Sequence, residues 1–171
     1  MLCLLAVVVV NHCFGQADRP VSLYVSADVN HTLYDRTYSN NAVGFGAGLQ
    51  LYVRTKTWVR PALDVSSYIY GGTKEMRVTA DGRPIYAKDG VTSVYGGVYL
   101  QAAPRWFGSF TAGPSFFNGS TYFGIKPGVG YYLLKGRQLA AKISFTNIFQ
   151  HDDISNENFG YYTVSFALKV F

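Results

Sequence analysis

Cysteine is almost absent from this chain of 171 residues. The two cysteines, Cys3 and Cys13, both fall within residues 1–15. We interpret residues 1–15 as a secretory signal peptide, because an apolar core is followed by small residues just before Gln16. The alternative is that the valine run of this segment forms a buried first strand. An exported domain of residues 16–171 would contain no cysteine, which excludes a disulfide framework.

Long apolar runs and charged residues are scarce as well. No run reaches the roughly 18 apolar residues that a transmembrane helix needs. Charged residues make up 15% of the chain, whereas it contains 18 glycines, 14 tyrosines and 12 phenylalanines. This composition favours an all-β protein in an apolar solvent over a soluble helical domain. The formal net charge is +5, but no run of lysine and arginine exists, so we expect no nucleic-acid partner.

The last stretch of the chain, residues 159–171, alternates strictly between two kinds of residue. Its apolar members recur at every second position: Tyr162, Val164, Phe166, Leu168 and Val170. A period of two is typical of a β-strand with one apolar face. A long and nearly uncharged strand at a chain end would be an exposed edge. Pairing with the first strand would close a barrel and remove that edge.

Seven further segments alternate in the same way, which predicts eight strands in all. They are residues 21–29, 42–54, 58–70, about 92–104, about 109–117, 121–134 and 138–149. The second, fourth and sixth connections are short, and the first, third and seventh are longer, as in outer-membrane barrels. Asp81-Gly82 predicts a small ribbon in the third connection, and Asn118-Gly119 makes the fifth a tight hairpin. Pro114 and Pro127 lie in mid-strand, where we expect bulges.

Charges are segregated by face. The eight apolar faces carry no Asp, Glu, Lys or Arg, and the mid-strand charges lie on the opposite parity: Asp28, Arg60, Asp64, Lys126, Lys142 and Lys169. An Arg or Lys that faces lipid at mid-depth costs about 2–4 kcal/mol, so a membrane barrel requires this segregation. These six residues are then predicted to form a polar network in the lumen, because buried charges need partners.

A water-soluble barrel of the lipocalin type would reverse the two faces and place the apolar residues inside. Two features favour the membrane barrel. The polar parity is rich in glycine and tyrosine but poor in charge, which is unsuited to a surface in water. Aromatic residues such as Trp58, Trp106 and Phe149 also gather near the predicted strand ends, as interfacial girdles do.

Over nearly all of residues 20–171, the chain resembles small eight-stranded outer-membrane proteins of the OmpA and OmpX kind, including the porin-like barrels of Bacteroidetes. The resemblance implies an eight-stranded antiparallel up-and-down transmembrane β-barrel in the outer membrane of a Gram-negative bacterium. It further implies a monomer surrounded by outer-membrane lipid and lipopolysaccharide. The terminal strand, which ends in Phe171, resembles the segment that the barrel assembly machinery recognises.

Some barrels of this size modify lipid A, so an active site is one alternative. Residues 151–158 faintly resemble the His-x-Ser-Asn motif of lipid A deacylases, with His151 and Ser155 in the matching roles. Their spacing of four places the two side chains roughly 13 Å apart on an extended strand. We therefore interpret this segment as a polar loop. Asp152 and Asp153 alone do not indicate a metal site, and we predict no catalytic residue, metal or cofactor.

A narrow anion-preferring pore is the other alternative. On the inward parity, basic residues outnumber acidic ones: Arg54, Arg60, Arg105, Lys126, Lys142 and Lys169 stand against Asp28 and Asp64. Eight strands, however, leave an interior only wide enough for side chains. The sequence therefore favours a lumen filled by a polar plug of ion pairs and tyrosine hydroxyls, in a protein that binds or shields through its loops.

Overall fold

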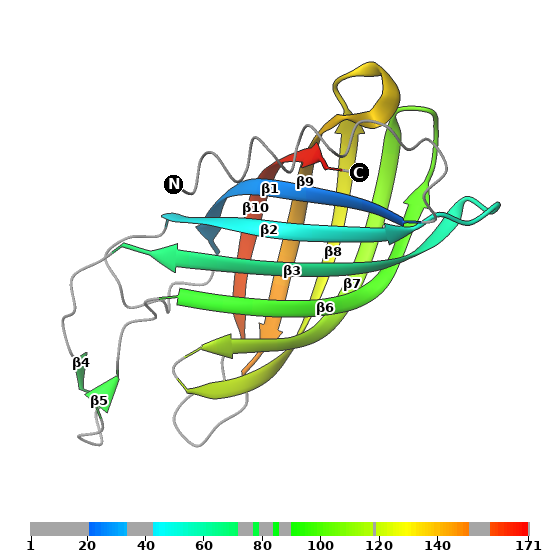
Figure 1. Cartoon of the computed structure of the whole chain (residues 1–171). Helices are drawn as coiled ribbons and strands as arrows, with labels where there is room; N and C mark the ends of the chain where they lie inside the picture. Colours follow the sequence, from blue (N-terminus) through cyan, green and yellow to red (C-terminus); the bar gives the residue numbers. More distant parts are fainter. Residues whose placement is uncertain are drawn as a thin grey trace, which may run out of the picture.

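The computed structural model describes residues 21–33, 43–71, 77–78, 84–85, 90–117, 119–150 and 158–170. Within these residues the chain forms a closed antiparallel barrel of eight strands, with a small two-stranded ribbon beside it (Figure 1). The barrel strands are β1 (Val21–Thr32), β2 (Val43–Val53), β3 (Val59–Tyr70), β6 (Gly90–Gln101), β7 (Trp106–Phe117), β8 (Ser120–Tyr132), β9 (Leu139–Phe149) and β10 (Phe159–Lys169). The predicted up-and-down barrel is confirmed.

The first and last strands close the barrel. β1 pairs with β10 from Tyr24 opposite Lys169 to Thr32 opposite Tyr161. Backbone hydrogen bonds continue past both ends of this ladder, from Val170 N to Leu23 O at 2.8 Å and from Leu33 N to Gly160 O at 2.9 Å. Closure leaves no open edge, which is the condition for a sheet in lipid. Phe171 lies outside the described residues.

The connections differ in length at the two ends of the barrel. At one end, here called the short-turn end, residues 54–58, 102–105 and 133–138 join successive strands. At the long-loop end, residues 33–42, 71–89 and 150–158 do so, together with a tight hairpin at 118–119. This asymmetry and its one exception are as the sequence predicted. The turn glycines Gly119 (φ 74°) and Gly136 (φ 78°) occupy the left-handed region that other residues rarely adopt.

The third connection contains the predicted ribbon, in which β4 (Arg77–Val78) pairs antiparallel with β5 (Pro84–Ile85). Asp81-Gly82 itself falls outside the described residues. The turn between β8 and β9 includes a short 3-10 segment, η1 (Lys135–Arg137). Nowhere in the described ranges is there a helix long and apolar enough to cross a membrane.

Several expectations about the strands were wrong in detail. The fourth predicted strand ends at Gln101 rather than about residue 104, and the fifth begins at Trp106 rather than about residue 109. The first strand extends beyond residue 29 to Thr32, because polar residues that point into a lumen do not end a strand. The prolines create no bulge. Beside Pro114 the β6–β7 ladder keeps one register from Ser93–Ser115 to Gly96–Ala112, and the β8–β9 ladder does likewise around Pro127. Each proline interrupts one ladder but remains aligned in the β7–β8 ladder, so no extra residue is inserted.

The faces of the barrel are those of a protein in lipid. Large apolar side chains such as Phe45, Val129 and Phe166 are exposed on the outer surface. Polar side chains such as Ser93 and Thr163 are fully buried in the lumen. A water-soluble barrel would have the opposite arrangement, so the predicted facing is confirmed.

Candidate functional site in the barrel lumen

A buried ion-pair network ties opposite walls of the barrel together. The carboxylate of Asp64 on β3 accepts hydrogen bonds from Lys126 Nζ on β8 at 2.8 Å and from Lys142 Nζ on β9 at 3.0 Å. The whole residues are only 5%, 2% and 3% exposed, respectively. β3 is not a neighbour of β8 or β9 in the sheet, so this network, here called the Lys-Asp-Lys bridge, crosses the lumen.

The ammonium group of Lys126 has further partners on β3. Its Nζ lies 3.4 Å from Ser66 Oγ and 3.3 Å from the Tyr68 hydroxyl oxygen, as well as 5.9 Å from the centroid of the Tyr68 ring. A lysine has three N–H donors, and Asp64, Ser66 and Tyr68 together use all three. A buried charge is tolerable only when it is paired and hydrogen-bonded in this way.

The other three residues that the sequence indicated for the lumen lie outside the bridge. Asp28 is buried on β1, and its Oδ1 has no hydrogen-bond partner in the part of the chain that the structure describes. Arg60 lies closer to the short-turn end, with its Cζ 5.8 Å from the centroid of the Tyr99 ring. Lys169, at the end of β10, is half-buried. None of these three forms an ion pair within the described part of the chain.

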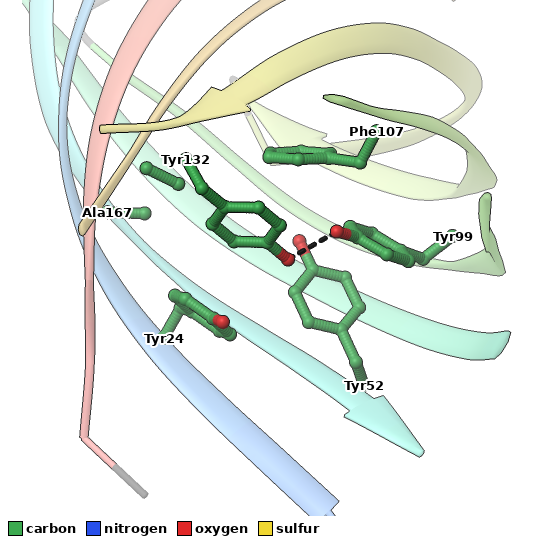
Figure 2. Close-up of a cluster of buried hydrophobic side chains, with 7 residues drawn as sticks. Tyr24, Tyr52, Tyr99, Phe107, Tyr132 and Ala167 are labelled. Atoms are coloured by element: carbon green, nitrogen blue, oxygen red, sulfur yellow. Dashed lines mark hydrogen bonds between the residues drawn. The ribbon is translucent and has the colours of Figure 1, made fainter. Parts of the chain in front are cut away.

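A layer of aromatic side chains crosses the lumen between the bridge and the short-turn end. This tyrosine layer consists of Tyr24, Tyr52, Tyr99, Phe107 and Tyr132, which come from five different strands (Figure 2). The rings of Tyr52 and Tyr99 lie 4.5 Å apart between centroids, and Tyr99 stacks on Phe107 at 4.9 Å. The hydroxyls of Tyr99 and Tyr132 are hydrogen-bonded to each other.

The remaining hydroxyls of the tyrosine layer also find partners. Tyr24 donates to the backbone oxygen of Arg137 at 3.0 Å, and Tyr52 donates to Gln50 Oε1 at 2.5 Å. Aromatic rings fill a narrow lumen well because each buries a large apolar area, while its hydroxyl is hydrogen-bonded within the layer or to a neighbouring group.

A second aromatic cluster lies on the opposite side of the bridge, towards the long-loop end. Tyr68 packs edge-on against Tyr161 at 5.5 Å between centroids, and Tyr70 packs against Phe159 at 6.0 Å. The inward residues of β3 show the order of these layers. Asp64 precedes Tyr68 and Tyr70 along the strand, so the bridge lies between the two aromatic groups.

Inward glycines make room for these rings, a signal that the sequence reasoning did not use. Gly46 is aligned with Tyr68, and Gly130 is aligned with Phe107 on the neighbouring strand. A Cβ placed on Gly130 would lie 2.2 Å from Phe107 Cζ and 2.8 Å from the backbone oxygen of Ala141. Outward Gly96, by contrast, has nothing within 4 Å of such a Cβ. Glycine opposite an aromatic residue on adjacent strands could therefore have indicated the ring layers.

One wall of the lumen is polar but only partly hydrogen-bonded. Ser26 and Asp28 on β1, Thr163 and Ser165 on β10, and Ser144 on β9 each carry a buried oxygen with no hydrogen-bond partner among the described residues. These strands are adjacent in the barrel, so the five oxygens form one continuous polar strip. Such groups are sites that bind ordered water.

In the described ranges, no three His, Cys, Asp or Glu side chains gather where they could hold a metal ion. His151, Asp152, Asp153 and Ser155, which belong to the deacylase-like segment, lie outside those ranges. The described part of the lumen holds opposite charges together and fills the barrel with aromatic rings.

Comparison with known proteins yields likeness in structure only. No protein-family model matches the sequence, and no curated protein matches it either. The crystal structure of Ail, the attachment invasion locus protein of Yersinia pestis, superposes with a TM-score of 0.58 at 10% identity, covering 87% of this chain and 97% of Ail. The structure of Ail in a phospholipid bilayer nanodisc gives a TM-score of 0.57 at 11% identity, covering 86% and 98%.

A transmembrane β-barrel designed de novo matches about as well, with a TM-score of 0.56 at 14% identity over 91% of this chain and all of the designed one. A designed protein shares the architecture without an evolved function, so these likenesses concern the fold. Together with the apolar exterior and the polar, charge-paired lumen, they show that this chain has the fold of small eight-stranded outer-membrane β-barrels.

Proposed function

We propose that the protein is a non-catalytic integral outer-membrane barrel whose lumen is closed by a plug and whose loops bind or shield. The Lys-Asp-Lys bridge carries this proposal. It occupies the middle of the lumen, with an aromatic cluster on each side along β3. A transport path would need polar groups that are free to exchange partners, whereas Lys126 is fully committed to Asp64, Ser66 and Tyr68.

The cellular setting is part of the same proposal. The exterior suits a barrel surrounded by outer-membrane lipid and lipopolysaccharide in a Gram-negative bacterium. The proposal also includes assembly through the terminal strand ending in Phe171, a monomeric state and kinship with the porin-like barrels of Bacteroidetes. The closed β1–β10 seam and the strand pattern of the sequence support the membrane location, and the resemblance of the sequence to small outer-membrane barrels suggests the other points.

Insertion of the barrel into a membrane and closure of its lumen can be tested together in purified protein. We expect the protein to require detergent, to show a β-rich spectrum, and to migrate differently on gels before and after heating. In planar bilayers we expect no conductance steps, because the bridge and the tyrosine layer both cross the lumen. A water-soluble monomer would overturn the membrane barrel. Anion-selective conductance steps that disappear in Lys142→Gln would show that the lumen is a pore and not a plug.

The pore is the second candidate because of the continuous polar strip on β1, β10 and β9. The strip runs beside the bridge rather than through it: along the ladders Asp28 is aligned with Ser165, and Ser165 with Lys142. Bound water would satisfy these oxygens without opening a path for ions, because the tyrosine layer lies between the strip and the short-turn end.

The lipid A hydrolase is the remaining alternative, and it depends on His151 and Ser155 in the connection between β9 and β10. We expect no loss of acyl chains when outer membranes are incubated with the protein and their lipid A is analysed by mass spectrometry. Acyl loss with the natural chain but not with Ser155→Ala would establish the hydrolase instead. The same assay with Ser144→Ala, a change inside the lumen, controls for general effects on folding.

A further inference from the structure

The positive charge of the protein is concentrated at one end of the barrel. Within the described ranges, the short-turn end carries no Asp or Glu and has these basic residues: Arg54, Lys56, Arg60, Arg105, Lys135, Arg137 and Lys169. In the sequence of the long connections at the other end, acidic residues outnumber basic ones. Since Asp28 and Asp64 balance Lys126 and Lys142 in the lumen, the excess positive charge lies at the short-turn end.

Three of these cations are exposed on the short turns of the barrel. Lys56, Arg105 and Lys135 are exposed, and each belongs to a different short turn. The inward position that the sequence predicted for Arg105 was wrong, because this residue lies in a turn and contacts the outward-facing Tyr131. None of the three cations has a carboxylate within ion-pair distance among the described residues. We call these three residues the basic rim.

Each residue of the basic rim borders the apolar band. Lys56 is two positions from Trp58, Arg105 directly precedes Trp106, and Lys135 directly follows Leu134. Trp58, Trp106 and Leu134 are among the exposed apolar side chains of the outer surface. The basic rim therefore lies where the hydrocarbon region gives way to headgroups, the level at which tryptophan gathers and long basic side chains extend towards water.

The Arg105 turn shows how a rim residue is held at this boundary. Its Nη1 donates to the Tyr131 hydroxyl at 3.1 Å, and the Tyr131 ring packs edge-on against Trp106 at 4.9 Å between centroids. Aromatic side chains thus fix the guanidinium beside the lipid-facing surface. Guanidinium groups bind phosphate oxygens strongly because two of their N–H groups match the geometry.

The half-buried cations at the mouth of the lumen strengthen the field at this end. Arg137 lies over the ring of Tyr132, with its Cζ 5.5 Å from the centroid, and Arg60 lies near Tyr99. Together with Lys169 they have no ion-pair partner among the described residues. Charges within roughly 10 Å of one another act together at moderate salt.

We propose that the basic rim binds the phosphate groups of anionic phospholipids in the leaflet that surrounds the short-turn end. The three cations stand on the separate turns β2–β3, β6–β7 and β8–β9, so they are spread around the perimeter rather than gathered at one point. A layer of headgroups touches all three at once, whereas one small anion would meet only one. This inference rests on the proposed location of the barrel in a membrane.

The two tryptophans of the chain, Trp58 and Trp106, provide the probe, because both stand beside rim residues. The protein is refolded into phosphatidylcholine vesicles that contain brominated phosphatidylcholine or brominated phosphatidylglycerol, and quenching of tryptophan fluorescence gives the relative association of each lipid. We expect phosphatidylglycerol to be preferred by about fivefold or more at low salt. The preference should fall towards one in Lys56→Gln/Arg105→Gln/Lys135→Gln.

The matched control is Lys74→Gln/Arg83→Gln/Lys88→Gln, which removes the same charge from the β3–β6 connection and should retain the preference. Equal quenching by the two lipids, or an unchanged preference in the rim variant, would refute the proposal. Loss of the preference with inorganic phosphate, but not with sodium chloride of equal ionic strength, would indicate a small-anion site and also refute it. If the protein failed to insert into any vesicle, the proposed membrane location itself would be wrong.

Discussion

Asp64→Ala is expected to lower the free energy of unfolding by about 3–5 kcal/mol, because it leaves two lysines charged and buried without their common partner. Lys126 and Lys142 are 2% and 3% exposed, so water does not replace the lost carboxylate. Urea unfolding of the protein in lipid vesicles, followed by tryptophan fluorescence, measures the change. Trp58 and Trp106 are exposed on the outer surface and report on loss of contact with lipid.

Asp28→Ala is the matched control, since Asp28 is equally buried in the lumen but has no ion pair with either lysine. We expect it to cost less than half as much. A second variant, Asp64→Ala/Lys126→Met/Lys142→Met, should recover most of the loss, because replacing a whole buried ion network with apolar groups is often neutral. If Asp64→Ala cost no more than Asp28→Ala, the bridge would not be what holds the walls together.

Val129→Arg should cost about 2–4 kcal/mol, the penalty for a guanidinium that faces lipid near the middle of the membrane. Val129 is 52% exposed on the outer face of β8, in line with Pro127 and Ile125 along the strand. Refolding into vesicles, with protease protection and urea unfolding as readouts, tests this cost.

Val53→Arg provides the comparison, because Val53 is 36% exposed on the same outer face but is the last residue of β2, at the short-turn end. Near the interface the same substitution should cost about 0–1 kcal/mol. Equal costs at the two positions would mean that no hydrocarbon layer surrounds the barrel. A collapse of the core in Val129→Arg, with loss of all β-structure in detergent, would instead indicate the lipocalin-like facing.

The sequence alone determined the number of strands, their order and the direction in which their side chains point. Alternation in residues 159–171 and 21–29 identifies the terminal strands, and a chain with open strand edges has no stable state in lipid. The direction of the side chains followed from the positions of the charged residues. Asp64 and Lys126 could not face lipid without a large cost in the free energy of folding. These features depend on whether each side chain faces lipid or the lumen, and the alternation of residue types along each strand reflects that difference.

The tertiary structure decided which charges meet. Asp28 and Asp64 are equivalent in the sequence pattern, yet Asp64 alone takes both lysines. Neither contact joins adjacent strands, so each depends on how the closed barrel brings β3 opposite β8 and β9. The tyrosine layer is of the same kind, since its members come from five strands. Alternation places a side chain inside the barrel, but only the register of all eight strands places two side chains at the same height across a narrow lumen.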